Sequence, residues 1–230
     1  MLHITDGSVA SGLIEAAGID GERLAWDDVL HEGPVPAGLD LAALSAVRAG
    51  FIAGAGWDGR AAVEAKFAAR DSRLRALAPA AEEIVLWFEA DLYDQVQLIQ
   101  VLDLLAGEIA TGAPVSLVEI DGHFGTRRAA DMAGLLDARR EVTEGQVSAA
   151  RRAWAAFRAE TPSGLVDLLD GDIEALPFLR DAIWRHMEEF PSAENGLTRS
   201  EWQMLAGVAG KRPTVATLFK IGRASCRERV

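Results

Sequence analysis

The residues IVLWF, at positions 84–88, form an uninterrupted apolar run that is followed at once by a helical pattern. A strand that is apolar at every position has to be covered on both faces, which is typical of parallel sheets in α/β proteins. Three further segments are strand-like, namely LHI at 2–4, RLAW at 23–26 and VSLVEI at 115–120. Helical segments separate the four runs. The sequence therefore predicts a three-layer α/β domain with a mostly parallel sheet over residues 1–140.

The segments between the apolar runs have a helical composition, in which Ala, Leu, Arg and Glu dominate. The predicted helices span residues 8–17, 41–53, 59–77, 92–109 and 128–138. The connection after Trp26 contains Gly33, Pro34 and Pro36, which interrupt regular structure. We therefore expect an irregular loop between the second strand and the helix that begins at Leu41.

Strand patterns stop after about residue 141, and only helical patterns follow. Helices are predicted at 143–160, in a short segment ending at Gly171, at 177–190 and at 197–210. In the last of these, Thr198 and Glu201 have the spacing of a capping box. Residues 141–219 are thus expected to form an all-helical C-terminal region, which could be a separate subdomain.

The last ten residues, IGRASCRERV, do not continue the pattern before them. They are similar to the conceptual translation of a sequencing-library adapter, which fits Ile221 to Val230 without a mismatch. We expect residues 220–230 to be a non-native tail and the natural chain to be truncated after about Phe219. Cys226, the single cysteine, would then have no function, and one cysteine excludes an intrachain disulfide.

The net charge of −12 argues against a protein that coats DNA or RNA by bulk attraction. No apolar run approaches the roughly 18 residues that a membrane span needs. The N-terminus, MLHITDGSVA, lacks the basic residues that open a secretory signal. We therefore predict a cytoplasmic protein without membrane contact. The sequence specifies no cofactor, metal ion or oligomeric state.

Polar residues are concentrated where the clearest strand ends. Glu89, Asp91, Asp94 and Gln95 follow the apolar run, and ligands of parallel sheets bind outside the carboxyl ends of the strands. Part of this pattern has a structural explanation, because Asp91 can cap the next helix and Asp94 suits its first turn. Gln95 and Gln97 fit a polar helix face opposite a buried stripe of Leu92, Val96, Ile99 and Leu102.

The other predicted strands also end in polar residues. Asp6, Gly7 and Ser8 follow the first strand, and Asp28, His31, Glu32 and Gly33 lie in the loop after the second strand, where Asp27 precedes them. Asp121, Gly122 and His123 follow the fourth strand. If all four strands are parallel, these groups converge on one edge of the sheet.

Two uses of this edge remain open from the sequence. Histidine and carboxylates can bind a metal, and clustered carboxylates with histidine can perform acid–base chemistry. Glu89, Asp91 and His31 are the candidate catalytic residues. The candidate ligand-binding residues are Asp6, Gly7, Ser8, Asp28, Glu32, Gly33, Asp94 and Gln95. A water-filled acidic crevice without a metal is an equal alternative, and Ser8 is expected to act as a helix N-cap more than as an anion site.

Several motifs resemble the bacterial family called domain of unknown function 1835. They are LHITDGS near the N-terminus, WDDVLHEGPVP at 26–36, LWFEADLYDQVQLIQVLD at 86–103 and FPSAENGLTRSEWQML at 190–205. The resemblance covers most of residues 1–219 and implies no established activity. Members of that family have one more residue around Asp6-Gly7-Ser8 and often a histidine where this chain has Ala90. These departures weaken any metal site that depends on those positions.

The sequence supports three functions. The first is binding of a small polar or phosphorylated ligand at the strand ends, with hydrolysis or group transfer as the chemistry. The second is a transcription-associated regulatory role, because residues 197–219 resemble a helix-turn-helix unit with Arg199, Lys211 and Arg212 near a second helix at Pro213. The third is a scaffold whose acidic crevice binds a basic protein segment.

The tryptophans have a structural prediction of their own. Trp57, beside two glycines, is expected to be partly exposed. The other five, Trp26, Trp87, Trp154, Trp184 and Trp202, are expected to anchor the core or an interface.

Overall fold

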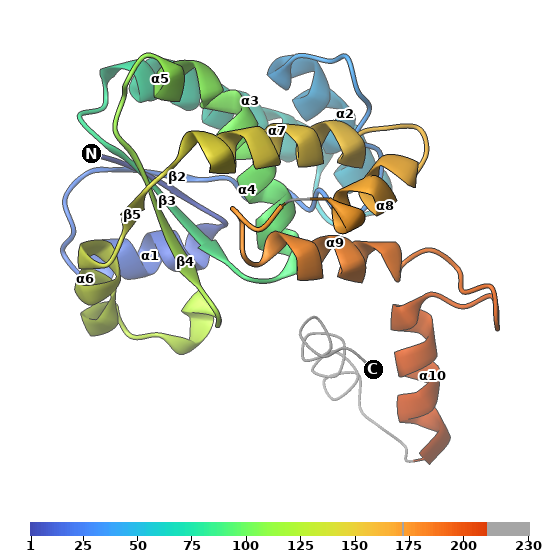
Figure 1. The fold of residues 1–230 in the computed structure, drawn as a ribbon. Helices are drawn as coiled ribbons and strands as arrows, with labels where there is room; N and C mark the ends of the chain where they lie inside the picture. Colours follow the sequence, from blue (N-terminus) through green and yellow to red (C-terminus); the bar gives the residue numbers. More distant parts are fainter. Residues whose placement is uncertain (172, 211–230) are drawn as a thin grey trace.

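The computed structural model describes residues 1–171 and 173–210, and its centre is a five-stranded sheet with the strand order β2-β1-β3-β4-β5 (Figure 1). The strands are β1 (Leu2–Thr5), β2 (Glu22–Ala25), β3 (Ile84–Glu89), β4 (Val115–Ile120) and β5 (Arg140–Glu141). Strands β1 to β4 pair in parallel, and β5 pairs antiparallel to β4. The α/β class and the mostly parallel sheet are thus confirmed.

Strand β5 was not predicted from the sequence. It consists of two exposed charged residues, so it carries no apolar pattern that a sequence reading could detect. It lies where the sequence suggested a boundary between the sheet and the helical region.

The helices largely follow the predicted segments. Their bounds are α1 (Ser8–Ala16), α2 (Leu41–Gly54), α3 (Arg60–Leu77), α4 (Leu92–Leu104), α5 (Ala106–Ala110), α6 (Ala129–Asp137), α7 (Glu144–Phe157), α8 (Ser163–Asp170), α9 (Leu179–Met187) and α10 (Arg199–Gly210), with short 3-10 turns η1 (Ala78–Ala80) and η2 (Phe124–Thr126). The single helix predicted over 92–109 is two helices, α4 and α5, which meet at Leu105.

Strand β3 is apolar throughout because helices cover both of its faces. Ile84, Leu86 and Phe88 belong to a large cluster with residues of α2, α3, α4 and α7. Val85 and Trp87 point to the other face, where they pack with residues of α1, η2 and α6. Alternate residues thus face two different helix layers, which explains the absence of a polar/apolar alternation.

The order of the strands reverses between β1 and β3. The chain passes from β1 to β2 on one side, and then returns through α2 and α3 to place β3 on the other side of β1. In open α/β sheets, the crevice at such a reversal, outside the carboxyl ends of the two strands, is the usual ligand site. The residues after β1 and β3 therefore occupy the position that matters most for function.

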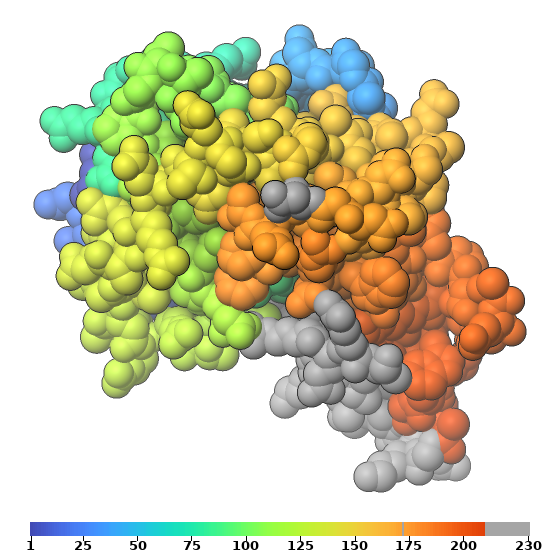
Figure 2. Space-filling view, viewed as in Figure 1, coloured from blue at the N-terminus to red at the C-terminus, as the bar shows by residue number. Residues whose placement is uncertain are grey.

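Helices α7, α8 and α9 pack on the sheet domain through α4, and Figure 2 shows them covering one face of the molecule. One cluster of buried residues runs from β1 and β3 to Trp154 on α7, Leu168 on α8 and Ile183 on α9. The helical C-terminal segment and the sheet thus share apolar core. Helix α10 projects from the lower right of the same view.

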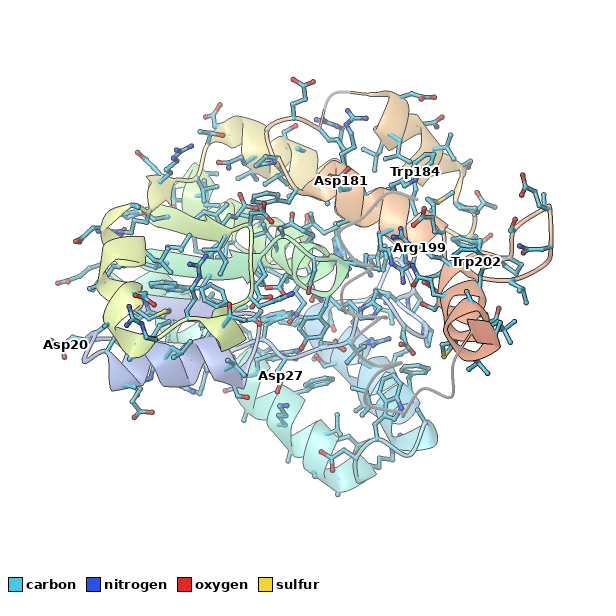
Figure 3. All side chains as sticks on the ribbon, turned by 90° about the horizontal axis from the view of Figure 1, so that it is seen from below. Asp20, Asp27, Asp181, Trp184, Arg199 and Trp202 are labelled. Atoms are coloured by element: carbon cyan, nitrogen blue, oxygen red, sulfur yellow. The ribbon has the colours of Figure 1, made fainter. Side chains whose placement is uncertain are left out.

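The tryptophan predictions are confirmed in part. Trp26, Trp87 and Trp154 are buried, and Trp57 is half exposed as expected. Trp184 and Trp202 do not lie in the core, because 50% and 45% of these residues are exposed. The expectation that they anchor an interface stays a prediction. Both lie on short peripheral helices, α9 and α10, whose outer faces nothing in the described part of the chain covers (Figure 3).

The capping box at Thr198 is present. Thr198 Oγ1 accepts a hydrogen bond from the backbone N–H of Glu201, and Glu201 accepts one from the N–H of Thr198. The second helix expected near Pro213, the basic residues Lys211 and Arg212, and the tail at 220–230 with Cys226 lie outside the described residues. No helix within the described ranges is long and apolar enough to cross a membrane.

Candidate functional site

The carboxyl edge of the sheet carries five carboxyl groups, Asp6, Asp27, Glu89, Asp91 and Asp94, which are called the edge cluster below. Asp6 follows β1, Asp27 follows β2, and Glu89 is the last residue of β3. Asp91 and Asp94 belong to the start of α4. The charges of Glu89, Asp91 and Asp27 all act on the pKa of Asp6, so residues far apart in the sequence are neighbours here.

Glu89 is held in place by two donors. One carboxylate oxygen, Oε1, accepts a hydrogen bond from the backbone N–H of Phe124 at 2.5 Å. The other, Oε2, lies 2.6 Å from His123 Nδ1. Glu89 is 7% exposed, whereas the side chain of His123 is one-third exposed. The pair therefore presents an oriented imidazole at the rim of the sheet.

Glu89, Asp91 and His123 have the arrangement of a candidate metal centre. One ligand atom from each residue lies within 4.8 Å of the other two. An imidazole with two carboxylates suits Zn²⁺ or Mn²⁺. His123 was noted in the sequence as a polar residue after β4 but was not among the candidate catalytic residues. Its place beside Glu89 follows from the parallel pairing of β3 and β4.

Asp91 and Asp94 shape the start of α4. Asp91 is the N-cap, and its Oδ1 accepts a hydrogen bond from the N–H of Asp94 at 3.1 Å. Asp94 Oδ1 in turn accepts one from the N–H of Glu89 at 2.6 Å. Burial, and next the charge of Asp6, raise the pKa of Asp94 well above its usual value. Asp94 thus ties the helix to the end of β3.

Asp6 is the least satisfied member of the edge cluster. Burial raises its pKa to about 7, and the charge of Glu89 adds to the shift. Its Oδ1 is buried without a hydrogen-bond partner among the described residues. A carboxyl group that titrates near neutrality in a crevice is suited to acid–base chemistry.

The role expected for Ser8 is wrong. Gly7, in an extended conformation, is the N-cap of α1, and Ser8 is the first helical residue. No side chain caps this helix, and Ser8 is exposed. The residues Gly7 and Ser8 therefore bring Asp6 to the edge without contributing a polar side chain of their own.

Three residues that the sequence did not single out as site residues also belong to this edge. Asp27 has a φ of 55°, a conformation that non-glycine residues adopt at few positions. It forms an ion pair with Lys66 of α3 and accepts a hydrogen bond from Tyr93 Oη at 3.3 Å. In Figure 3, Asp27 lies below the centre of the view, well away from Asp20 at the left edge. No local pattern marks Lys66, which is one of many charged residues on a helix.

Asp28, Glu32 and Gly33 hold the loop after β2. Asp28 is buried and accepts a hydrogen bond from Arg48 Nε at 3.0 Å. The same guanidinium donates to the carbonyls of Val29 and Glu32, at 2.7 and 2.6 Å. Gly33 has a φ of 76°, and a Cβ there would lie 2.5 Å from the Phe51 ring. These contacts account for Asp28 and Gly33 structurally, whereas Glu32 contributes its backbone carbonyl and its side chain is exposed.

His31 lies beside the edge cluster. Its ring packs edge-on against Tyr93, with 6.0 Å between the ring centroids. Burial lowers its pKa to about 4, although the charge of Asp91 opposes the shift. The histidine that contacts Glu89 is His123 and not His31. His3 serves the interior, where its Nδ1 accepts a hydrogen bond from Trp87 Nε1 at 3.1 Å.

The prediction that Gln95 and Gln97 form a polar helix face is wrong, because both are fully buried. Gln95 Nε2 donates to the carbonyl of Glu89 at 2.8 Å and to Glu119 Oε1 at 3.2 Å. Gln97 Oε1 accepts from the N–H of Asp28 at 3.3 Å. The buried stripe of Leu92, Val96, Ile99 and Leu102 is confirmed.

No protein-family model, no curated protein and no solved structure matches the chain. The resemblance to the domain of unknown function 1835 therefore stays a prediction.

Proposed function

We propose that Glu89, Asp91 and His123 bind a divalent cation, and that the cation holds the anionic group of a small polar ligand, such as a phosphate. Hydrolysis or group transfer is the chemistry that this arrangement favours. The observation that carries the proposal is the approach of three ligand atoms to within 4.8 Å at the carboxyl ends of β3 and β4.

Because the site is negatively charged, a cation should bind there before an anion does. The edge cluster contains five carboxyl groups, and Lys66 is the base paired with one of them. A phosphate entering such a site would meet repulsion unless a cation had first reduced the negative charge. A bound divalent ion would do so and would also polarise a phosphoryl or carbonyl oxygen.

The neighbouring groups can supply proton transfer. Asp6, whose pKa is raised to about 7, is suited to accept or donate a proton at neutral pH. Asp94 and Gln95 hold the backbone of Glu89 through hydrogen bonds to its N–H and its carbonyl. We assign Asp6 the acid–base role, and Asp94 and Gln95 the role of positioning the end of β3.

We also infer that the fold is a three-layer, Rossmann-like α/β arrangement and that the chain belongs to the domain of unknown function 1835 family. The strand order and the helices on both faces of β3 support the first inference. The quoted motifs support the second. The expected cytoplasmic location remains a prediction, as does the alternative role in transcription.

Calorimetric titration with Mn²⁺ and Zn²⁺ tests the cation site. The wild-type protein should bind one ion and melt at a higher temperature in its presence, because a ligand that binds the folded state stabilises it. Glu89→Gln, Asp91→Asn and His123→Ala should each weaken binding by about ten-fold or more. All three variants keep the size of the native side chain or reduce a partly exposed one, so the fold should survive.

Asp20→Asn is the matched control, because Asp20 is an exposed aspartate at the other end of the sheet. It should bind the ions like the wild type. Equal affinities in all five proteins would show that the ions bind elsewhere on an acidic surface, and the proposal would be wrong. Release of phosphate from small phosphate esters, measured with and without the ion, then tests the chemistry.

A further inference from the structure

The turn after β4 ends in an arginine that lies close to the candidate metal centre. This turn covers residues 121–127 and includes η2. Two of its residues contact Glu89, namely Phe124 through its backbone N–H and His123 through Nδ1, at 2.5 and 2.6 Å. The ring of Phe124 is fully buried and packs against Trp87 of β3. The first half of the turn is therefore fixed relative to Glu89.

Hydrogen bonds within the turn bring Arg127 back toward the first residues of the turn. Its backbone N–H donates to the carbonyl of Phe124 at 2.8 Å. The backbone N–H and the hydroxyl of Thr126 both donate to the carbonyl of His123, at 3.1 and 2.8 Å. A Cβ added to Gly122 would lie 3.3 Å from Nη2 of Arg127. The guanidinium thus lies against the backbone of the residue directly before His123.

The guanidinium of Arg127 is available to a ligand. The side chain is exposed, and it forms no hydrogen bond or ion pair with any residue in the described ranges. The next residue, Arg128, differs, because its Nη2 and its backbone N–H both donate to the carboxylate of Asp131, at 3.2 and 2.9 Å. These hydrogen bonds from Arg128 are the main cause that lowers the pKa of Asp131, and the charge of Arg127 adds least. Arg128 thus serves the start of α6, whereas Arg127 keeps up to five N–H donors for a ligand.

The positive charges that meet at this end of the sheet favour a dianion. A divalent cation at the candidate metal centre would supply two positive charges, and Arg127 supplies a third. A phosphate monoester carries close to two negative charges at neutral pH, because its second pKa is about 6, and it has three acceptor oxygens. A phosphate diester or a carboxylate has one negative charge and two such oxygens. A guanidinium binds two phosphate oxygens through parallel hydrogen bonds, which leaves the third oxygen of a monoester for the cation.

We propose that Arg127 and the cation together bind the dianionic phosphate group of a phosphate monoester. Two phosphate oxygens accept hydrogen bonds from the guanidinium, and the third binds the cation. Arg127 is then the residue that selects monoesters over diesters and carboxylates. This inference deepens the proposed function and rests on it, because the cation holds one of the three oxygens.

Calorimetric titration of the full chain at pH 7.5 measures this selection in two steps. The affinity for Mn²⁺ is determined first. The Mn²⁺-loaded protein is then titrated with methyl phosphate, dimethyl phosphate and acetate. Methyl phosphate should bind at least about ten-fold more tightly than either of the other two, because only the monoester offers three oxygens and a second negative charge. In EDTA its binding should be weaker, because the carboxylates of the edge cluster then repel it.

Variants assign the selection to Arg127. Arg127→Met should weaken methyl phosphate binding by about ten-fold or more, because it removes two charge-assisted hydrogen bonds. It should not weaken Mn²⁺ binding, and the fold should survive because the side chain is exposed. Arg127→Lys keeps the charge without the paired donors and should recover only part of the affinity. Arg128→Met is the matched control, since it removes the same charge from the next residue, whose side chain is 82% exposed. It should bind methyl phosphate like the wild type.

Unchanged methyl phosphate affinity in Arg127→Met would overturn the proposal. Equal losses in Arg127→Met and Arg128→Met would also overturn it, because they would show an effect of bulk charge alone. So would equal affinities of the wild type for methyl and dimethyl phosphate. These three results leave the cation site standing, because Mn²⁺ binding is measured separately in every protein. A wild type that does not bind Mn²⁺ would instead refute the cation site, and this inference with it.

Discussion

The carboxyl groups at the sheet edge differ in how well their surroundings satisfy them. Asp91 accepts a backbone hydrogen bond at the start of α4, and Asp94 accepts one from the N–H of Glu89. Glu89 in turn contacts the N–H of Phe124 and the ring of His123. Asp28 is neutralised by a buried arginine. Asp6 has a buried oxygen without a partner among the described residues. A buried carboxyl group without a hydrogen bond lowers the stability of the folded state. Groups that proteins keep despite such a loss of stability cluster at functional sites.

Asp6→Asn should make the protein more stable at pH 8 in the absence of divalent ions. The folded state raises the pKa of Asp6 to about 7, so it binds the proton more tightly than the unfolded chain does. The wild type therefore loses stability as the pH rises from about 4 to about 7. The asparagine variant lacks this loss and should gain roughly 1–3 kcal/mol above pH 7, with the gain shrinking toward zero at pH 4.

Urea unfolding at pH 4, 6 and 8 measures the difference, with Asp20→Asn as the exposed control. Divalent ions should reduce the difference at pH 8, because a cation bound by Glu89 and Asp91 lowers the electrostatic cost of the nearby Asp6 carboxylate. If the gain of the Asp6→Asn variant is the same at all three pH values, proton binding by Asp6 is not its cause.

Residue types and strand ends in the sequence were sufficient to place Asp6, Glu89, Asp91 and Asp94 on one edge. They were not sufficient to choose between His31 and His123. That choice depends on the direction of each side chain, which the loops after β2 and β4 determine. The sequence also gives no sign that Asp28, in the loop that carries His31, pairs with Arg48 on α2.

Among the elements, the contact between α4 and α7 depends on small side chains. Ala149, Ala150 and Ala153 are buried on the face of α7 that meets α4, so the two helices can approach closely. The position of α7 in turn places Phe157 and Arg158 in the wall of a cavity between the loop after β2 and α9.

Ala150→Leu should destabilise the protein by about 1–3 kcal/mol or more, because the added atoms have no space between α4 and α7. Ala155→Leu is the matched control on the exposed side of the same helix and should change stability by less than about 0.5 kcal/mol. Chemical unfolding of both variants gives the comparison. Similar values for the two would mean that α7 does not pack on α4 through this face.

The sequence predicted elements well where they are long and apolar. The bounds expected for β4 match those observed, because Pro114 precedes the segment and Asp121-Gly122 follow it. Strand β5 has no apolar run, and α4 and α5 share one helical composition although the helix is interrupted at Leu105. The pairing of β5 with β4 and the interruption of the helix at Leu105 both depend on tertiary contacts, which local sequence patterns do not reveal.

For the whole molecule, the shared apolar core has a consequence for folding. The cluster that includes β1, β3 and α4 also includes residues of α7, α8 and α9. A fragment of residues 1–141 would expose the face of α4 that α7 and α9 normally cover. We expect this fragment to lack a cooperative thermal transition. In the full chain, the part from β1 to α9 should unfold in a single transition.

Calorimetry and near-ultraviolet circular dichroism of the fragment and the full chain provide the measurement. Two separate transitions in the full chain, with the first lost in the fragment, would show instead that the sheet is stable without the helices. In that case the helical segment would be an independent unit, as one interpretation of the sequence allowed.

The reversal of strand order also affects how the chain must be made. Strand β1 lies between β2 and β3, yet β3 emerges from the ribosome long after β1 and β2 have done so. During this interval one edge of β1 has no partner, and an unpaired apolar strand is a template for aggregation. The nascent chain would therefore depend on chaperones until residues 84–89 arrive to close the sheet.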